Sequence, residues 1–338
     1  MHNSHSPQPI SIVFVFDEKY CKFAKVTAYS IAVNTSSPLA FYVVDCGMTE
    51  PSRKALRQFL SSLPNVTAVH IQQPERIPAI ENFPFPSWFS SAVFYRLAIP
   101  KIFPELKRCI YMDCDVIVNG DIKQLFDEDL QGRPFGAVEE EGHFFDSASQ
   151  QKRKQKIGMS PEKRYFNSGV LLIDCPTFEQ HQVFERVIQT ITETTCHFSC
   201  PEQDAMNVCL SSDEHFPLSP RYNFCFCTPL AKPCLKMNPS PLIIHFSWTK
   251  PWLLHKKIVQ WCYRIHLARF TFDFVLLYWQ YADKISLTEY SSTDKIFSLK
   301  FVYKRLFQPV ERFFAKGIRN KLLSFFKKDQ TSRSIKKP

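Results

Sequence analysis

The sequence predicts an α/β fold with a mostly parallel central sheet flanked by helices. Short runs of β-branched and aromatic residues at 11–16, 41–45 and 66–71 alternate with helical patterns at 21–33 and 50–60. Strands and helices that alternate at this spacing form right-handed crossovers between parallel strands. Hydrophobic residues make up 45% of the 338 residues, which is enough for one large domain with a substantial core.

The rest of the chain continues the alternation up to about residue 246. Pro100 is expected to end one helix and Pro201 to begin another, because proline is tolerated only in the first turn. The expected elements are helices at 90–99, 178–191 and from 201, and strands at 109–112, 135–138, 169–173 and 242–246.

The net charge of +10 is concentrated at one end of the chain. Residues 299–338 hold twelve lysines and arginines against two acidic residues, whereas residues 1–298 hold thirty of each sign. A basic body would have indicated polyanion binding by the core itself, whereas a basic, aromatic tail on a neutral body indicates a docking segment. We therefore predict two regions: a catalytic domain at 10–268 and a helical, membrane-associating region at 269–338.

Cysteine usage and hydropathy indicate a cytoplasmic protein. The run at 11–16 is too short for a signal peptide, and the chain has no apolar stretch of 18 residues. The twelve cysteines are therefore expected to be reduced thiols. A zinc site is a weaker interpretation because the spacings fit no common module; its candidates are Cys196, Cys200, Cys225, Cys227 and Cys234.

Asp113 and Asp115 are the strongest candidates for metal ligands. They follow a buried strand directly, and ligands of open α/β sheets bind at the carboxyl ends of strands. At strand spacing, residues i and i+2 project to one side, so both carboxylates can meet one hard cation. A pair of solvated turn residues is the alternative, but the apolar runs on both sides of the pair argue against it.

His245 ends another expected core strand, and Lys250 follows five residues later. A lone histidine in a strand is more often a core residue. Here, the imidazole is suited to a metal ion and the lysine to a phosphate. Two carboxylates and one imidazole leave octahedral positions open for diphosphate oxygens, which favours Mn²⁺ or Mg²⁺.

Taken alone, Arg96 could be a surface arginine, Asn167 could belong to an ordinary turn at 167–169, and the acidic residues at 202–204 could be a solvated first helical turn. Together with the residues above, their order resembles glycosyltransferase family 8, which includes lipopolysaccharide galactosyl- and glucosyltransferases. The resemblance covers roughly residues 10–255. It is densest in the segments SSAVFYRLAIP, YMDCDVIVNGDI, QKIGM, RYFNSGVLLID and HFSWTKPW.

The resemblance implies a GT-A fold, a UDP-sugar donor and a divalent metal ion that bridges the UDP diphosphate. By position, the metal ligands would be Asp113, Asp115 and His245. Nucleotide contacts would come from Asp17, from Asp113 with Cys114 near the ribose, and from Lys250 at the diphosphate. The donor sugar would be lined by Arg96, Glu140, Asn167, Gln203 and Asp204, with Gln203 and Asp204 as the catalytic pair.

The function predicted is a retaining transferase that moves glucose or galactose from a UDP-sugar to a lipid-anchored lipopolysaccharide or lipooligosaccharide core. The enzyme would work on the cytoplasmic face of the inner membrane, held there by its tail. A protein or polysaccharide acceptor is the alternative. A nucleic-acid-binding role for the tail would leave Asp113, Asp115 and His245 unexplained, so no nucleic acid partner is expected.

Overall fold

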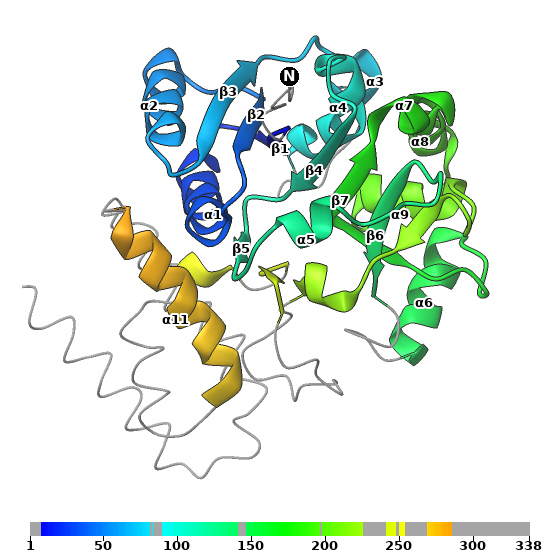
Figure 1. The fold of residues 1–338 in the computed structure, drawn as a ribbon. Coiled ribbons are helices and arrows are strands. Elements are labelled where there is room, and N and C mark those ends of the chain that lie inside the picture. The colour runs from blue at the N-terminus through cyan, green and yellow to red at the C-terminus, as the bar shows by residue number, and fades with distance from the viewer. Residues whose placement is uncertain are drawn as a thin grey trace, which may run out of the picture.

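A seven-stranded sheet forms the centre of the protein in the computed structural model (Figure 1). The structure describes residues 8–81, 83, 90–140, 147–196, 198–225, 241–247, 250–253 and 269–285. The strand order is β3-β2-β1-β4-β7-β6-β8. The strands are β1 Ile10–Phe16, β2 Leu39–Asp45, β3 Val66–Gln72, β4 Arg108–Met112, β6 Phe135–Glu139, β7 Phe166–Asp174 and β8 His215–Pro217.

Most neighbouring strands in this sheet are parallel, as the alternating pattern predicts. The pairs β1–β2, β2–β3, β1–β4 and β6–β8 are parallel, and only β7 runs antiparallel to its neighbours β4 and β6. A second sheet has three short strands in the order β5-β10-β9. They are β5 Val116–Val118, β9 Phe224–Cys225 and β10 Ile243–His245.

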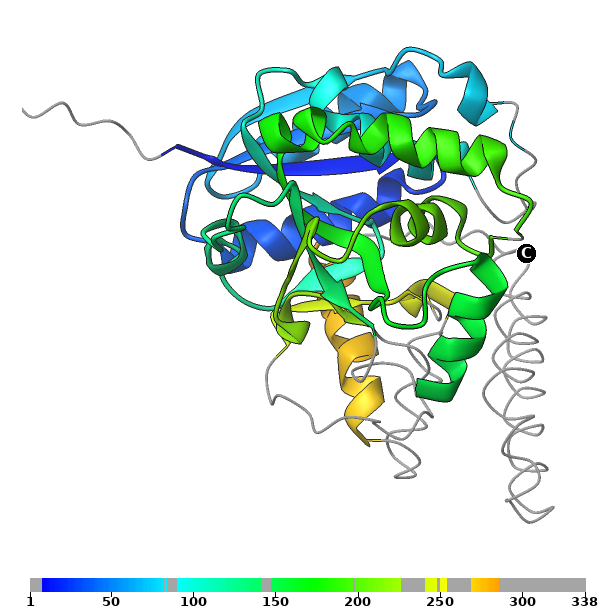
Figure 2. The ribbon, with the colours of Figure 1, turned by 90° about the vertical axis from the view of Figure 1, so that its right-hand side faces the viewer.

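Helices cover both faces of the large sheet (Figures 1 and 2). The helices are α1 Cys21–Asn34, α2 Glu50–Ser61, α3 Pro78–Glu81, α4 Ile99–Ile102, α5 Lys123–Phe126, α6 Ser147–Ile157, α7 Cys175–Gln180, α8 Val183–Glu193, α9 Pro201–Cys209 and α11 Arg269–Lys284. Three 3-10 helices complete the described elements: η1 Ser91–Ala98, η2 Pro220–Tyr222 and η3 Pro251–Leu253.

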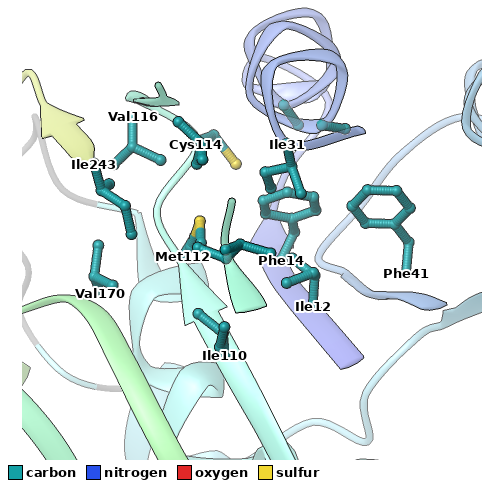
Figure 3. Packing of buried hydrophobic residues seen from close by; sticks show 14 of the residues in the cluster. Ile12, Phe14, Ile31, Phe41, Ile110, Met112, Cys114, Val116, Val170 and Ile243 are labelled. Carbon is teal, nitrogen blue, oxygen red and sulfur yellow. The ribbon is translucent and has the colours of Figure 1, made fainter. Parts of the chain in front are cut away.

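Alternate side chains of each central strand enter two separate cores. From β1, Ile12 and Phe14 join the cluster beneath α1, whereas Val13 joins the cluster beneath α7 and α8. Figure 3 shows the first cluster, in which Ile31 of α1 faces Phe14 and Ile12. Burial on both faces explains why these strands are continuous apolar runs.

Two expected helices differ from the prediction. The segment expected as one helix ending at Pro100 is the 3-10 helix η1 followed by α4, and Pro100 lies in the first turn of α4. Proline lacks only an N–H group that is unpaired there, so it starts this short helix instead of ending one. The helix expected at 178–191 is divided into α7 and α8, because Gln182 adopts a left-handed conformation with φ of 50°.

The helix α11 is the described part of the region beyond residue 268, and it packs against α1 (Figure 1). Asn34 of α1 donates a hydrogen bond to the Tyr281 hydroxyl at 2.8 Å, and Tyr278 is fully buried. The expected basic helix beyond 285 lies outside the described residues, and the boundary at 268 stays a prediction. In the described part of the chain, no helix has the length and apolar character needed to cross a membrane.

An ion pair joins α8 to the turn that precedes the edge strand β8. Arg186 of α8 binds Glu214, whose carboxylate also accepts the Ser211 backbone N–H at 2.7 Å. Burial alone would raise the pKa of the Glu214 carboxyl, but the bonds from Arg186 and Ser211 outweigh it and lower that pKa to about 2. An unfolded glutamate titrates near 4.5, so the stabilisation is complete above pH 4.5 and is lost as the pH falls through 2.

We predict that Glu214→Gln destabilises the protein at pH 7 by about 1–2 kcal/mol, because the charged partner of Arg186 is lost. Urea unfolding at several pH values measures this difference, which should shrink between pH 4.5 and pH 2. The control is Glu193→Gln at the exposed end of α8. A destabilisation by Glu214→Gln that is the same at pH 7 and pH 3 would contradict the assignment.

Candidate metal and donor site

The three expected metal ligands meet where the chain passes from the large sheet to the small one. Asp113 and Asp115 lie in the turn between β4 and β5, and His245 ends β10, which pairs antiparallel with β5. One ligand atom from each of the three residues lies within 4.8 Å of the others. The two carboxylates thus converge through a turn, not through the strand alternation that the sequence suggested.

Asp113 has one carboxylate oxygen held by the protein and one that faces His245. Its Oδ1 lies 3.0 Å from Arg96 Nη2 and also accepts the Tyr111 hydroxyl. Its Oδ2 lies 3.8 Å from His245 Nε2. The bonds to Oδ1 fix the rotation of the carboxylate, and Oδ2 is directed toward the other two ligands.

The two carboxylate oxygens of Asp115 also have different partners. Its Oδ1 lies 3.4 Å from His245 Nε2, and its Oδ2 contacts Lys250 Nζ. Burial alone would raise the pKa of the Asp115 carboxyl, but the charge of Lys250 and the contact with His245 lower that pKa below its usual range. Asp115 is therefore a carboxylate at neutral pH, which is the form that binds a metal ion.

These residues fit a hard divalent cation. Two carboxylate oxygens and one imidazole nitrogen are ligands that suit Mn²⁺ or Mg²⁺. The close approach of the ligands also depends on Gly169 of β7. A Cβ atom there would lie 2.3 Å from His245 Cε1 and 2.8 Å from Asp113 Oδ2, so only glycine leaves room for both side chains.

A local irregularity in β7 places Gly169 at the site. Ala137 of β6 pairs with Leu171, but the next residue, Val138, pairs with Asn167, so the register shifts between them. The extra residues of β7 form a bulge, a feature that commonly re-aims side chains next to functional sites. The segment 167–169, which resembled an ordinary turn in the sequence, thus lies within a strand.

Arg96 is buried, so the alternative of a surface arginine is wrong. Its guanidinium contacts Asp113 at 3.0 Å, Glu202 at 3.3 Å and the Ser168 carbonyl at 3.0 Å, and it lies over the Tyr111 ring. Burial disfavours the charged form, but Asp113, Tyr111 and Glu202 raise the pKa of Arg96 above its usual value. Arg96 remains a cation and joins η1 to the metal ligands.

The expected sugar-binding residues Glu140 and Asn167 are in direct contact. Asn167 Nδ2 donates to Glu140 Oε1 at 3.0 Å, and both side chains are buried. Arg153 of α6 lies 3.2 Å from Glu140 Oε2 and 3.0 Å from Asp204 Oδ1. Sequence reasoning missed Arg153, because it stands in the run KRK and nothing in the sequence distinguishes it from the neighbouring lysines.

Gln203 and Asp204 of α9 lie beside this group and have several protein partners. Gln203 Oε1 accepts the Ser168 backbone N–H at 2.9 Å, and its Nε2 donates to the Tyr165 hydroxyl at 2.9 Å. Asp204 is fully buried, and its Oδ2 accepts the backbone N–H groups of Ser199 and Cys200 at 2.8 and 2.9 Å. In this structure, Asp204 orients its neighbours, and its expected contact with a sugar stays a prediction.

The expected nucleotide-binding residues lie along the same edge of the sheet. Asp17 follows β1, and its Oδ2 lies 3.4 Å from the Ser90 hydroxyl. Cys114 is buried, and its carbonyl accepts the Thr27 hydroxyl at 3.1 Å. Because β1 and β4 are parallel neighbours, Asp17 and Asp113 both follow carboxyl ends of strands. The β1–α1 connection also holds Tyr20, an exposed aromatic residue that sequence reasoning did not single out.

The zinc site considered among the cysteines gains no support. The cysteines in the described part of the chain are free, and Cys227 and Cys234 lie outside it. Among the described residues, the group formed by Asp113, Asp115 and His245 is the one that could hold a metal ion.

We predict that Gly169→Ala weakens Mn²⁺ binding about 10-fold or more, because the added methyl group displaces the His245 ring. Isothermal titration calorimetry with Mn²⁺ measures the effect, and circular dichroism checks the fold. Gly120→Ala is the matched control, since a Cβ atom there meets Leu242 at an ordinary 3.5 Å. Equal Mn²⁺ affinity in both variants would show that Gly169 does not shape a metal site.

Comparisons with known proteins agree with the resemblance found in the sequence. The model of the family "Glycosyl transferase family 8" matches residues 11–255. The general stress protein A of Bacillus subtilis (strain 168) is 28% identical over 259 residues, covering 71% of this chain and 86% of that protein. The lipopolysaccharide 1,2-glucosyltransferase of Escherichia coli (strain K12) is 26% identical over 269 residues, covering 74% and 75%.

The crystal structure of the galactosyltransferase LgtC in complex with donor and acceptor sugar analogues has a similar fold. The TM-score is 0.63 at 23% identity, and the match covers 84% of this chain and 98% of that one. This likeness confirms the expected GT-A fold. Across four sequence relatives, the chain spans between 57% and 86% of their own length. With the family model matched over most of its length, the chain belongs to glycosyl transferase family 8.

Proposed function

We propose that the protein is a retaining, metal-dependent hexosyltransferase that moves glucose or galactose from a UDP-sugar to a lipopolysaccharide or lipooligosaccharide core. The observation that carries this proposal is the convergence of Asp113, Asp115 and His245 at the carboxyl edge of the sheet. Each ligand turns one atom toward the others, as one bound cation requires. Bound Mn²⁺ or Mg²⁺ would act as a Lewis acid on the diphosphate of the leaving UDP.

Lys250 is proposed to contact the same diphosphate. Its Nζ donates to the Asp115 carboxylate and to the backbone carbonyls of Phe246 and Ser247, at 3.0 and 3.2 Å for the two carbonyls. Burial disfavours its charge, but Asp115 raises the pKa of Lys250 above the usual value. A permanent cation beside a metal ligand can stabilise the negative charge that develops on the departing phosphate.

The nucleoside is proposed to lie along the carboxyl ends of β1 and β4. Asp17 offers carboxylate oxygens to the uracil or ribose, and the Asp113–Cys114 turn lies at the end of the neighbouring strand. Tyr20 is 38% exposed and lies near enough to Lys250 and Asp115 to feel their charges. An exposed ring at this position is suited to stack on a planar base.

The donor sugar is proposed to lie near Arg96, Glu140, Asn167, Gln203 and Asp204. These residues come from η1, β7, α9 and the position after β6, and they are joined by direct hydrogen bonds or through Ser168, Tyr165 and Arg153. Such a connected set holds its side chains rigid before substrate binds, which lowers the cost of ordering them. Selection between glucose and galactose would rest on side-chain placement near Glu140 and Gln203.

We propose a front-face displacement, in which the leaving phosphate accepts the proton of the acceptor hydroxyl. A double displacement needs a carboxylate that can attack the sugar. Asp204 is fully enclosed and Gln203 carries a weakly nucleophilic amide, which supports the front-face route. Negative charge on Asp204 would steady the oxocarbenium-like transition state from a distance.

The proposed acceptor rests on the relatives, and the proposed location at the membrane rests on the basic segment 299–338. Relatives include lipopolysaccharide transferases of Escherichia coli and Salmonella typhimurium. The excess of basic residues at 299–338 is suited to the anionic cytoplasmic face of the inner membrane. Each lysine or arginine near such a surface contributes about 1 kcal/mol to the free energy of binding. A lipid-anchored acceptor makes such attachment useful to the enzyme.

The donor reaction gives the most direct test. Purified protein with Mn²⁺ should release UDP slowly from UDP-glucose or UDP-galactose, and EDTA should stop the release reversibly. Asp113→Asn and Asp115→Asn should abolish it with the fold intact, because each removes a ligand charge. Asp127→Asn, an exposed carboxylate paired with Lys123, is the control. Full activity of either ligand variant, or activity in excess EDTA, would refute the metal assignment.

The route of displacement can be tested on α9. Gln203→Ala should lower the turnover about 10²-fold, the cost of one lost polar contact to the transition state. Asp204→Asn should be at least as harmful, because it removes a charge and weakens the hold on Arg153. Mass spectrometry should find no glycosyl-protein adduct in the native enzyme. An adduct on either residue, formed at a competent rate, would establish double displacement instead.

Deletion of residues 300–338 should release the protein from membrane fractions and leave UDP-hexose hydrolysis unchanged, because the basic excess is removed. Flotation on vesicles with and without anionic lipid measures the attachment. If the shortened protein still floats with anionic vesicles, another part of the chain is the anchor.

A further inference from the structure

A series of buried side chains connects the metal ligand His245 with Glu140. His245 Nδ1 lies 2.9 Å from Asn223 Oδ1, and Asn223 Nδ2 donates to Asn167 Oδ1 at 2.8 Å. Asn167 Nδ2 in turn donates to Glu140 Oε1 at 3.0 Å. The Asn223 side chain is fully buried, and it comes from the segment between η2 and β9.

The direction of each hydrogen bond in this series follows from one backbone group. The Gly169 backbone N–H, which can only donate, lies 2.9 Å from Asn167 Oδ1. That atom must therefore be the amide oxygen, and the atom of Asn223 that approaches it must be the amide nitrogen. The amide oxygen of Asn223 then faces His245, so the Nδ1 atom of His245 must carry the proton.

We infer that Asn223 is a positioning residue that holds His245 in the Nδ1–H tautomer and so directs the Nε2 lone pair at the metal ion. This inference rests on the metal site of the proposed function. Nε2 is the ring nitrogen nearest Asp113 and Asp115, at 3.8 and 3.4 Å, as the inference requires. Histidines that bind metal ions commonly donate the other ring N–H to a protein oxygen. Free histidine favours the opposite tautomer, so the protein must select this one.

The same bonds give the asparagines distinct tasks. Asn167 sets the orientation of Asn223 and also holds Glu140, which we place near the donor sugar. Of the two asparagines, Asn223 is the one that contacts the imidazole, and the Cys225 thiol lies 3.8 Å from its amide oxygen. Removal of Asn223 therefore acts on His245, whereas removal of Asn167 would act on both groups and is a less specific test.

The tautomer can be read directly in the metal-free protein. Long-range ¹H–¹⁵N spectra of protein labelled with ¹⁵N-histidine distinguish the two forms, and the His245→Gln variant assigns the signal among the ten histidines. We expect His245 as the Nδ1–H form in the native protein and a shift toward the Nε2–H form in Asn223→Leu. A native His245 in the Nε2–H form would overturn the inference, whether or not the variant folds.

The Mn²⁺ affinity gives a second readout that does not depend on turnover. Asn223→Leu keeps the volume but cannot accept the proton, and we expect calorimetry to show Mn²⁺ binding weakened about 10- to 100-fold. The control is Asn34→Ala, which removes side-chain bonds to Ser30 and Val118 on α1 and β5. Unchanged affinity in folded Asn223→Leu would overturn the inference. Native protein that binds no Mn²⁺ but shows the Nδ1–H form would refute the proposed function and keep the tautomer assignment.

Discussion

The site depends on how two like charges are held close together in an apolar setting. Asp113 and Asp115 both face His245, and burying carboxylates at this spacing is costly without partners. Each carboxylate has a cation on its outer oxygen, Arg96 for Asp113 and Lys250 for Asp115. These two cations allow the pair to exist in the folded protein, while the inner oxygens remain directed at a common point that a divalent ion can occupy.

The surrounding architecture serves this arrangement. The chain turns between β4 and β5 at the two aspartates, and β5 pairs with β10 so that His245 arrives opposite Val116. The bulge in β7 brings Gly169 against the imidazole, where any side chain would collide. Metal ligands, amide side chains and the partners of Gln203 are thus parts of one connected polar network.

Much of the fold was predictable, because buried strands are short apolar runs and the helices between them are periodic. The small sheet was predictable only in part: the sequence predicted β10, as a strand at 242–246, but not β5 or β9. β5 has three residues and β9 has two, so neither shows a period, and β5 pairs with a segment more than 120 residues away. The division between α7 and α8 at Gln182 could not be predicted from the sequence either, since glutamine rarely adopts positive φ.

The two aspartate ligands were recognisable because two carboxylates rarely stand between apolar runs directly after a buried strand. Their supporting residues were not. Arg153 stands among similar basic residues, and Asn223 is a single polar residue in an irregular segment. Their places become clear only in the folded chain, where α6 brings Arg153 to Glu140 and the η2–β9 connection brings Asn223 to His245. A sequence alone shows which residues can bind a metal ion, but not which side chains orient them.

Anomalous X-ray diffraction at the manganese edge, from crystals soaked with Mn²⁺ and UDP, tests the central claim most directly. Our account predicts one strong peak bounded by Asp113 Oδ2, Asp115 Oδ1 and His245 Nε2, with diphosphate oxygens completing its coordination. A peak elsewhere, or Mn²⁺ bound through His245 Nδ1, would contradict it.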